Sequence, residues 1–151
     1  MDKAVMQKIF RWTSVVLFSV LSLFMLWFGY VYAGVTDMLW FHGAAVPTEL
    51  HRPFLPLYLA LMNLIGGSSL AMGLLAGCVT IFPLRRGANW AAAALLTGFT
   101  LVFIIAAITA EELATTTGAP TSWHIMGVLQ AITLAAFAAH VVSKSIASKA
   151  R

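Results

Sequence analysis

The sequence predicts an all-α protein, a bundle of four transmembrane helices with both termini in the cytoplasm. Three observations lead to this prediction. Apolar residues make up 61% of the 151 residues and charged residues 9%, against about 25% charged residues in soluble domains. Four long apolar segments alternate with short polar ones, and the lysines and arginines gather in alternate polar segments. So little charge indicates that lipid surrounds most of the chain, as one domain over residues 1–151.

The first apolar segment, residues 13–35, contains no charged residue over 23 positions. A bilayer crossing needs about 20 such residues. Inside hydrocarbon the backbone must satisfy its own hydrogen bonds, which a single segment does as a helix. The segment is too long for the core of a signal peptide, and no cleavage site of the A-x-A type follows it. We therefore expect it to be the first transmembrane helix.

Three further apolar segments predict spans at about residues 57–82, 88–110 and 123–142. The connector between the first two spans, residues 36–56, contains three prolines, and prolines this dense argue against a regular helix. A connector of this length in a compact bundle is usually functional or contains a short element of its own. We therefore expect four crossings, with the connector as the longest segment outside them.

Basic residues predict the orientation of these crossings. The N-terminal segment contains three, the turn at residues 83–87 two and the C-terminal tail three, whereas Arg52 stands alone on the other side. Lysine and arginine favour cytoplasmic loops, so we expect both termini in the cytoplasm, on a bacterial inner membrane. The net charge of +4 reflects these flanks. The expected partner is the lipid bilayer and not nucleic acid, because no basic cluster lies on a soluble element.

This orientation gathers the acidic residues and most histidines at the outer end of the bundle, and ionisable groups near a span indicate function. The first hypothesis is a pocket that binds a lipophilic small molecule, because helix bundles form mostly apolar pockets with a few polar groups. Two polar side chains, Asn63 and Gln130, would orient the polar atoms of the ligand. Three aromatic residues would flank it: Trp27, Tyr30 and Trp123.

A second hypothesis assigns acid–base chemistry to the same end, as in an isomerase or a hydratase. A carboxyl group in a lipid-walled pocket can give or take a proton near neutral pH, and the candidate catalytic residues are Asp37, Glu111 and His124. No metal motif is present. If the protein holds a metal or haem, the candidate ligands are His51 and His124. The single cysteine, Cys78, allows no disulfide within the chain and no cysteine metal site, and the sequence names no cofactor.

A third hypothesis is a structural subunit of a larger membrane complex, with the outer charges as solvated loop residues. Small residues recur every fourth position on the second span, at Ser69, Gly73 and Gly77. Such rows let helix backbones approach closely, so they favour helix packing. The fourth span contains a similar row, Ala131, Ala135 and Ala139, which favours self-association into a homo-oligomer.

The segments LIGGSSLAMGLLAG and PLRRGANWAAAALL resemble the glycine-rich second span, short basic turn and alanine-rich third span of DoxX-like four-helix membrane proteins. The end of the first span, FGYVYAGVTDML, is also similar to theirs, so the resemblance covers about residues 25–110. It implies a four-helix integral membrane protein with an accessory role in a quinone-linked redox system. The chain contains no thiol pair or cofactor motif that would support a redox role directly.

Overall fold

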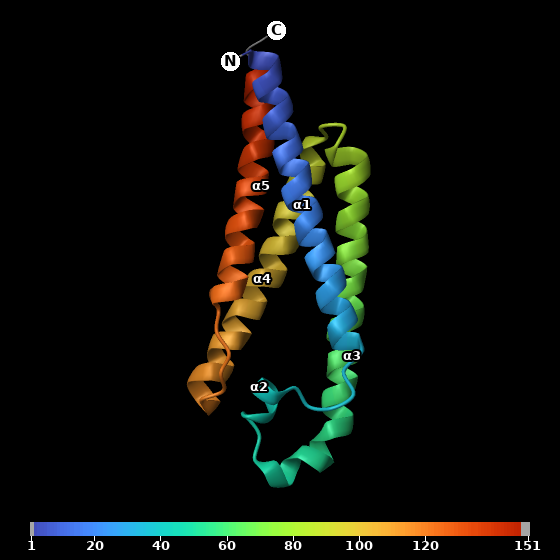
Figure 1. Cartoon of the computed structure of the whole chain (residues 1–151), viewed down its shortest axis with the longest axis vertical. Helices are drawn as coiled ribbons and strands as arrows, with labels where there is room; N and C mark the ends of the chain where they lie inside the picture. The colour runs from blue at the N-terminus through green and yellow to red at the C-terminus, as the bar shows by residue number, and fades with distance from the viewer. Residues whose placement is uncertain (1, 149–151) are drawn as a thin grey trace.

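The computed structural model describes residues 2–148, and within that range all regular structure is helical (Figure 1). The all-α prediction is confirmed. Four helices of the described chain are long and apolar enough to cross a membrane, one of them formed by α3 with the short elements at its two ends. The elements are α1 (Lys3–Ala33), α2 (Trp40–Gly43), η1 (Thr48–Leu50), α3 (His51–Val79), η2 (Thr80–Leu84), α4 (Asn89–Thr117) and α5 (His124–Ser148).

The long helices pack along one another in the order α3, α1, α5, α4. Helix α1 contacts α3 and α5 along much of its length, α4 packs against α5, and α3 and α4 approach each other chiefly near η2 (Figure 1). Both chain ends lie at one end of the molecule, here called the terminal end. The loop of residues 34–50 and the turn between α4 and α5 lie at the opposite end, here called the connector end.

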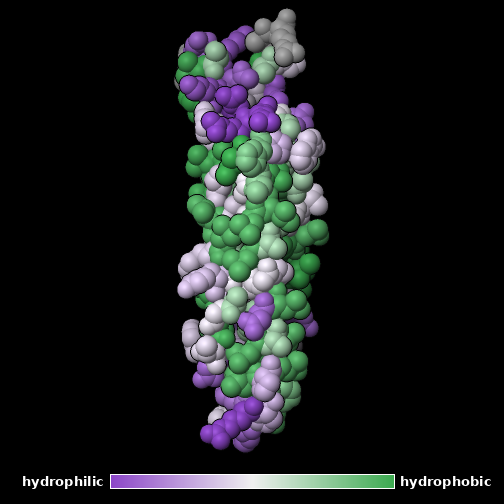
Figure 2. All heavy atoms as spheres, turned by 90° about the vertical axis from the view of Figure 1, so that its right-hand side faces the viewer, coloured by the Kyte–Doolittle hydropathy of each residue, from purple (hydrophilic) through white to green (hydrophobic). Residues whose placement is uncertain are grey.

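Buried residues recur at alternating spacings of three and four along the helices. In α3 they are Met62, Gly66, Ser69, Gly73 and Ala76, and α5 follows the same rhythm. This average period of 3.5 residues is the pattern of helices that pack at shallow angles along a narrow seam. Many other apolar side chains are exposed, and Figure 2 shows hydrophobic residues over most of the middle of one face, with hydrophilic residues at both ends.

Glycines bring the backbones of α1 and α3 together. A Cβ atom on Gly66 would lie 2.8 Å from the Cα atom of Ala33, and one on Gly73 would lie 2.9 Å from the backbone nitrogen of Leu26. Two members of the predicted small-residue row, Ser69 and Gly73, are buried. At the third, Gly77, a Cβ atom would have no described neighbour within 4 Å, so this residue takes no part in the contact. The interface follows the 3.5-residue period, whereas a row of every fourth residue drifts away from it.

Phenylalanine side chains fill the space between α1 and α4, which are not close through their backbones. The ring of Phe18 on α1 stacks on Phe99 of α4 with centroids 6.2 Å apart, and Phe99 stacks on Phe103 at 5.7 Å. Phe24 on α1 meets the edge of Phe103 at 6.4 Å. These rings form the centre of the core together with small residues of α4 and α5.

All four long helices are longer than the predicted spans, and polar side chains make hydrogen bonds at two of the extended ends. Helix α1 begins at Lys3 instead of residue 13, where Asp2 accepts a hydrogen bond from the backbone N–H of Ala4 at 3.1 Å. Helix α4 continues past residue 110 to Thr117. The hydroxyl groups of its last three threonines donate to carbonyls three or four residues earlier, which is a bond available within a helix.

The expectation that prolines keep residues 36–56 free of regular helix is wrong for its last part. Helix α3 begins at His51 and includes Pro53 and Pro56. A proline in the first turn removes an N–H that has no partner in the helix in any case, so Pro53 costs little. At the other end, Pro83 lies in the π-helical η2, where Arg85 N–H donates to Thr80 O at 3.1 Å. A π turn tolerates proline, which has no backbone N–H to donate.

Candidate functional site

The connector end contains an open hollow of about 570 Å³ formed by the last turns of α4 and the residue before α5. Five of its residues recur on one face of α4, since helix positions four apart lie one above the other. Two of these five are acidic. The hollow, called the Glu–Trp hollow below, is lined by Ala107, Ile108, Glu111, Glu112, Thr115 and Trp123.

The turn after α4 brings Trp123 to this face. Helix α4 ends at Gly118, whose positive φ of 71° suits glycine. The chain then runs back along the helix, because the Thr121 hydroxyl donates to the carbonyl of Ala110 at 2.8 Å and Ala119 is buried. Trp123 therefore lies beside Glu111, two turns before the end of α4, and not beyond it.

Neighbours on both sides hold the indole ring of Trp123. Its centroid is 4.5 Å from the imidazole of His124, at an interplanar angle of 18°. A Cβ atom on Gly127 would fall 2.8 Å from the ring, so the indole rests on a helix face that lacks a side chain. The side chain is still 49% exposed. The ring thus forms one wall of the hollow and stays partly exposed there.

The structure brings together two of the predicted site residues, Glu111 and Trp123, in this hollow. The other candidate catalytic groups bond locally: Asp37 accepts from the N–H of Met38 at 2.7 Å, and His124 Nδ1 lies 3.0 Å from the Ser122 hydroxyl. Acid–base chemistry by these three residues acting together therefore gains no geometric support.

The remaining predicted ligand-binding residues lie elsewhere. Trp27 and Tyr30 on α1 are 61% and 76% exposed, and Asn63 on α3 is also exposed. Gln130 on α5 donates through Nε2 to the Thr100 hydroxyl of α4 at 3.0 Å, so it joins two helices. Its Oε1 atom is buried and has no hydrogen-bond partner in the described chain. Ligand contacts by these four residues stay a prediction.

Sequence reasoning missed Glu112 and Thr115 as lining residues. They stand one and four positions beyond Glu111, and a longer helix would have placed them on its face, but the predicted span ends at residue 110. It also missed Tyr58, which organises the connector. The Tyr58 hydroxyl accepts from the N–H of Leu39 at 3.2 Å and lies 2.9 Å from His42 Nδ1.

Histidines fasten the connector to the start of α3. His51 Nε2 lies 2.9 Å from the carbonyl of Val46 and 3.2 Å from that of Gly43, so it carries the proton and donates to both. This predicted haem or metal ligand thus has a structural role. Within residues 2–148, no three side chains of His, Cys, Asp or Glu come close enough to hold a metal ion together.

The His42–Tyr58 contact predicts a pH-dependent connector. The Tyr58 hydroxyl lies 2.9 Å from His42 Nδ1 and can donate its proton there only while the imidazole is neutral. Burial lowers the pKa of His42 from its ordinary value of 6.5. His42 therefore takes up a proton more readily in the unfolded segment than in the folded one. The stability that the neutral imidazole gives the connector is present above about pH 6.5 and is lost as the pH falls through the lower pKa of the folded state.

We expect Tyr58→Phe to loosen the connector by about 1–2 kcal/mol, since both hydrogen bonds of the hydroxyl disappear. Hydrogen–deuterium exchange at Leu39, measured at pH 5.5 and 7.5 and corrected for intrinsic rates, tests this. Tyr30→Phe is the matched control, because Tyr30 is exposed. Wild-type protection of Leu39 in Tyr58→Phe at both pH values would contradict the assignment.

Comparisons with known proteins add no family to these observations: no family model, curated protein or solved structure matches the chain. The resemblance to DoxX-like proteins therefore stays a prediction.

Proposed function

We propose that the chain is an integral membrane protein that crosses the bilayer four times and binds a lipophilic small molecule in the Glu–Trp hollow. The observation that carries this proposal is the meeting of Glu111, Glu112 and Trp123 in one hollow of about 570 Å³. Small-molecule pockets usually have volumes of about 300–1,000 Å³ and combine apolar walls with a few polar groups.

The distribution of charge supports an orientation with both termini in the cytoplasm. Lysines and arginines of α1, of the turn after η2 and of α5 lie at the terminal end (Figure 1). Four acidic residues and Arg52 belong to the connector end. Basic residues favour the cytoplasmic side. The hollow then faces the outer side, where Ile108 and Ala107 are next to lipid and the two carboxyl groups are next to the headgroups.

The lining also indicates the chemistry of the ligand. An ionised carboxylate accepts hydrogen bonds and donates none, so the ligand must present a donor or a positive charge to Glu111 and Glu112. The exposed part of the Trp123 ring attracts a cation or a flat ring. An apolar tail would lie along Ile108 and the lipid. A lipophilic amine has these features, and so does a quinol, whose hydroxyl groups can donate to both carboxylates.

Protein purified in mild detergent should contain a small lipophilic molecule, which mass spectrometry of the extracted complex identifies. We expect Trp123→Ala and Glu111→Gln to reduce its content about tenfold or more, because each removes a wall or a charge-assisted hydrogen bond worth about 1.5–3 kcal/mol. A quinone or quinol in the extract would support the role that the DoxX-like resemblance implies.

Glu49→Gln is the matched control, since Glu49 is an exposed acid of the connector end that lies outside the hollow. It removes the same charge and should leave the ligand content unchanged. An equal ligand content in all four proteins, or the absence of any such molecule from wild-type protein, would refute binding in the Glu–Trp hollow.

A further inference from the structure

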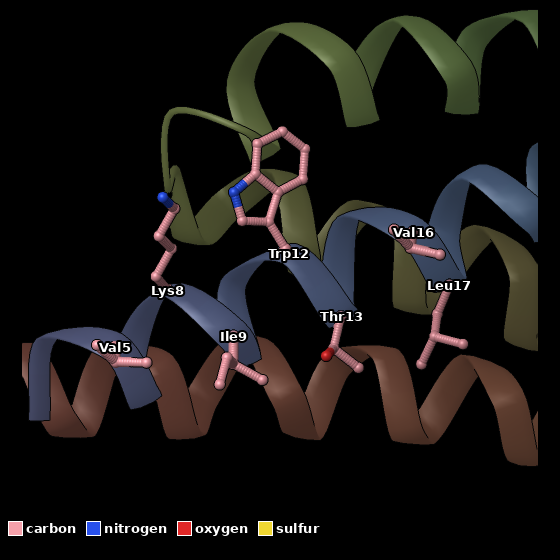
Figure 3. Close-up of a pocket in the computed structure, with 7 residues that line it drawn as sticks. All are labelled: Val5, Lys8, Ile9, Trp12, Thr13, Val16 and Leu17. Atoms are coloured by element: carbon pink, nitrogen blue, oxygen red, sulfur yellow. The ribbon is translucent and has the colours of Figure 1, made fainter. Parts of the chain in front are cut away.

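A second hollow, of about 610 Å³, runs along α1 at the terminal end (Figure 3). All of its lining residues belong to α1, in two adjacent rows with members four residues apart, which lie side by side on a helix. One row is Val5, Ile9, Thr13 and Leu17, and the other is Lys8, Trp12 and Val16. The hollow, called the groove below, is open and mostly apolar, with a single charged lining residue.

Two basic side chains, Lys8 and Arg85, lie near Trp12 at one side of the groove. The guanidinium carbon of Arg85 lies 5.5 Å from the centre of the Trp12 ring, above its face. Lys8 precedes Trp12 by one helical turn in the same row, about 6 Å along the axis. Figure 3 shows that Lys8 and Trp12 point to the same side of α1, toward the turn that follows η2. The guanidinium group of Arg85 thus lies over the Trp12 ring, and Lys8 extends from the same side of α1.

Negative charge is scarce around these groups. Of the five acidic residues in the sequence, Asp2 is the one at the terminal end, and its carboxylate is engaged with the N–H of Ala4. The turn after η2 adds Arg86, and the Lys144 ammonium of α5 packs against Gly87, where a Cβ would lie 2.8 Å from it. The groove therefore has a positive mouth and an apolar floor.

We propose that this groove binds an anionic phospholipid of the cytoplasmic leaflet. The phosphate would lie between Lys8 and Arg85, and one acyl chain would follow the floor toward Val16 and Leu17. The two rows span thirteen residues from Val5 to Leu17, or about 18 Å of helix, which covers the headgroup layer and the first half of one leaflet. Val16 is 53% exposed, which leaves this part of the floor open to an acyl chain.

The alternative of free phosphate fits the floor poorly, because inorganic phosphate uses the basic groups and leaves the apolar rows uncovered. Tryptophan at this depth also favours the lipid, since its ring prefers the boundary between hydrocarbon and headgroups. The inference rests on the membrane insertion and orientation of the proposed function, but not on the Glu–Trp hollow.

Full-length protein, reconstituted in vesicles of phosphatidylglycerol and phosphatidylcholine and then extracted for native mass spectrometry, tests the groove. We expect preferential retention of phosphatidylglycerol, about fivefold or more lower in Lys8→Ala or Arg85→Ala, because each variant loses a charge-assisted contact with the lipid phosphate. Arg11→Ala removes the same charge from α1 outside the groove and should leave retention unchanged. An equal loss in Arg11→Ala, or no preference in wild type, would overturn the site.

A second pair of variants tests the apolar floor without changing charge. Thr13→Phe places a ring in the groove and should lower phosphatidylglycerol retention, whereas Val20→Phe, at an exposed position of α1 outside the groove, should not. Loss in both variants or in neither would overturn the assignment of the acyl chain. Displacement of the lipid by excess inorganic phosphate would reassign the basic groups to a free anion.

Reporter tags on both termini, measured in the same vesicles, separate this inference from the proposed function. Tags on opposite faces, or protein that fails to insert, would refute the four-crossing orientation itself. Tags on one face together with wild-type lipid retention in Lys8→Ala would refute the lipid site alone.

Discussion

Gly66→Ala is expected to destabilise the protein by about 1–3 kcal/mol, whereas Gly67→Ala, one residue later, should be neutral or stabilising by up to about 1 kcal/mol. The two substitutions add the same methyl group to the same helix. They differ in what the methyl group meets. On Gly66 it would fall on the backbone of Ala33 in α1, and on Gly67 no described atom lies within 4 Å.

The sign of the Gly66 effect follows from the rigidity of its neighbour. A flexible side chain can rotate away from a new methyl group, but the Cα of Ala33 cannot move without the whole end of α1. Lipid tails are as apolar as the helix surfaces, so association depends on close fit and not on removal of apolar surface from water. Widening the α1–α3 contact therefore loses dispersion contacts along the entire interface.

Thermal or denaturant unfolding in mild detergent, followed by circular dichroism, measures both variants. Gly73→Ala should behave like Gly66→Ala, because its Cβ would meet the backbone of Leu26. Equal stabilities for Gly66→Ala and Gly67→Ala would mean that α1 and α3 do not pack through their backbones. A destabilised Gly67→Ala would point to a contact on the outward face of α3.

The four long helices could be predicted because the length of an apolar run is a local property of the chain. The helix ends were less predictable. Helix α4 extends to Thr117, and each of its last threonine hydroxyls finds a carbonyl within its own helix, although threonine in isolation also favours turns. Similarly, proline in general breaks helices, while the position of Pro53 in the first turn of α3 makes it compatible with one.

Rotation of the helices about their axes limited the prediction of the site. The depth of Asn63 along its span predicts a place in the outer half of the bundle, yet this residue is exposed on α3, because depth carries no information on which side of a helix faces its neighbours. Glu111 and Trp123 are both predicted site residues, but in different roles. Their meeting depends on the backward path of the turn, which the Thr121–Ala110 hydrogen bond fixes across eleven residues.

The contact between His42 and Tyr58 had no signal in the sequence. The two residues are sixteen positions apart, on opposite sides of a connector whose path no periodicity constrains. A histidine and a tyrosine at that separation are common in any chain. Long-range pairs of this kind require the fold, whereas pairs on one helix, such as Glu111 and Thr115, follow from the helix once its end is known.

Phe99→Ala is expected to cost about 3–5 kcal/mol of stability, the range for a fully buried phenylalanine. Its side chain is 0% exposed and stacks on Phe18 of α1 and on Phe103 within α4. Since the backbones of α1 and α4 are not in close contact, the rings are what joins these helices. In Phe99→Ala, the residues around the missing ring cannot fill the cavity unless α4 moves away from α5.

Phe99→Leu and Phe54→Ala make this expectation specific. Leucine retains much of the volume of the ring and should cost clearly less than alanine, because the residual cavity is smaller. Phe54 lies exposed in the first turns of α3, so its truncation should change stability by about 0.5 kcal/mol or less. Unfolding in mild detergent gives all three values on one scale. Similar values for Phe99→Ala and Phe54→Ala would show that lipid or detergent, and not the rings of α1, covers this face of α4.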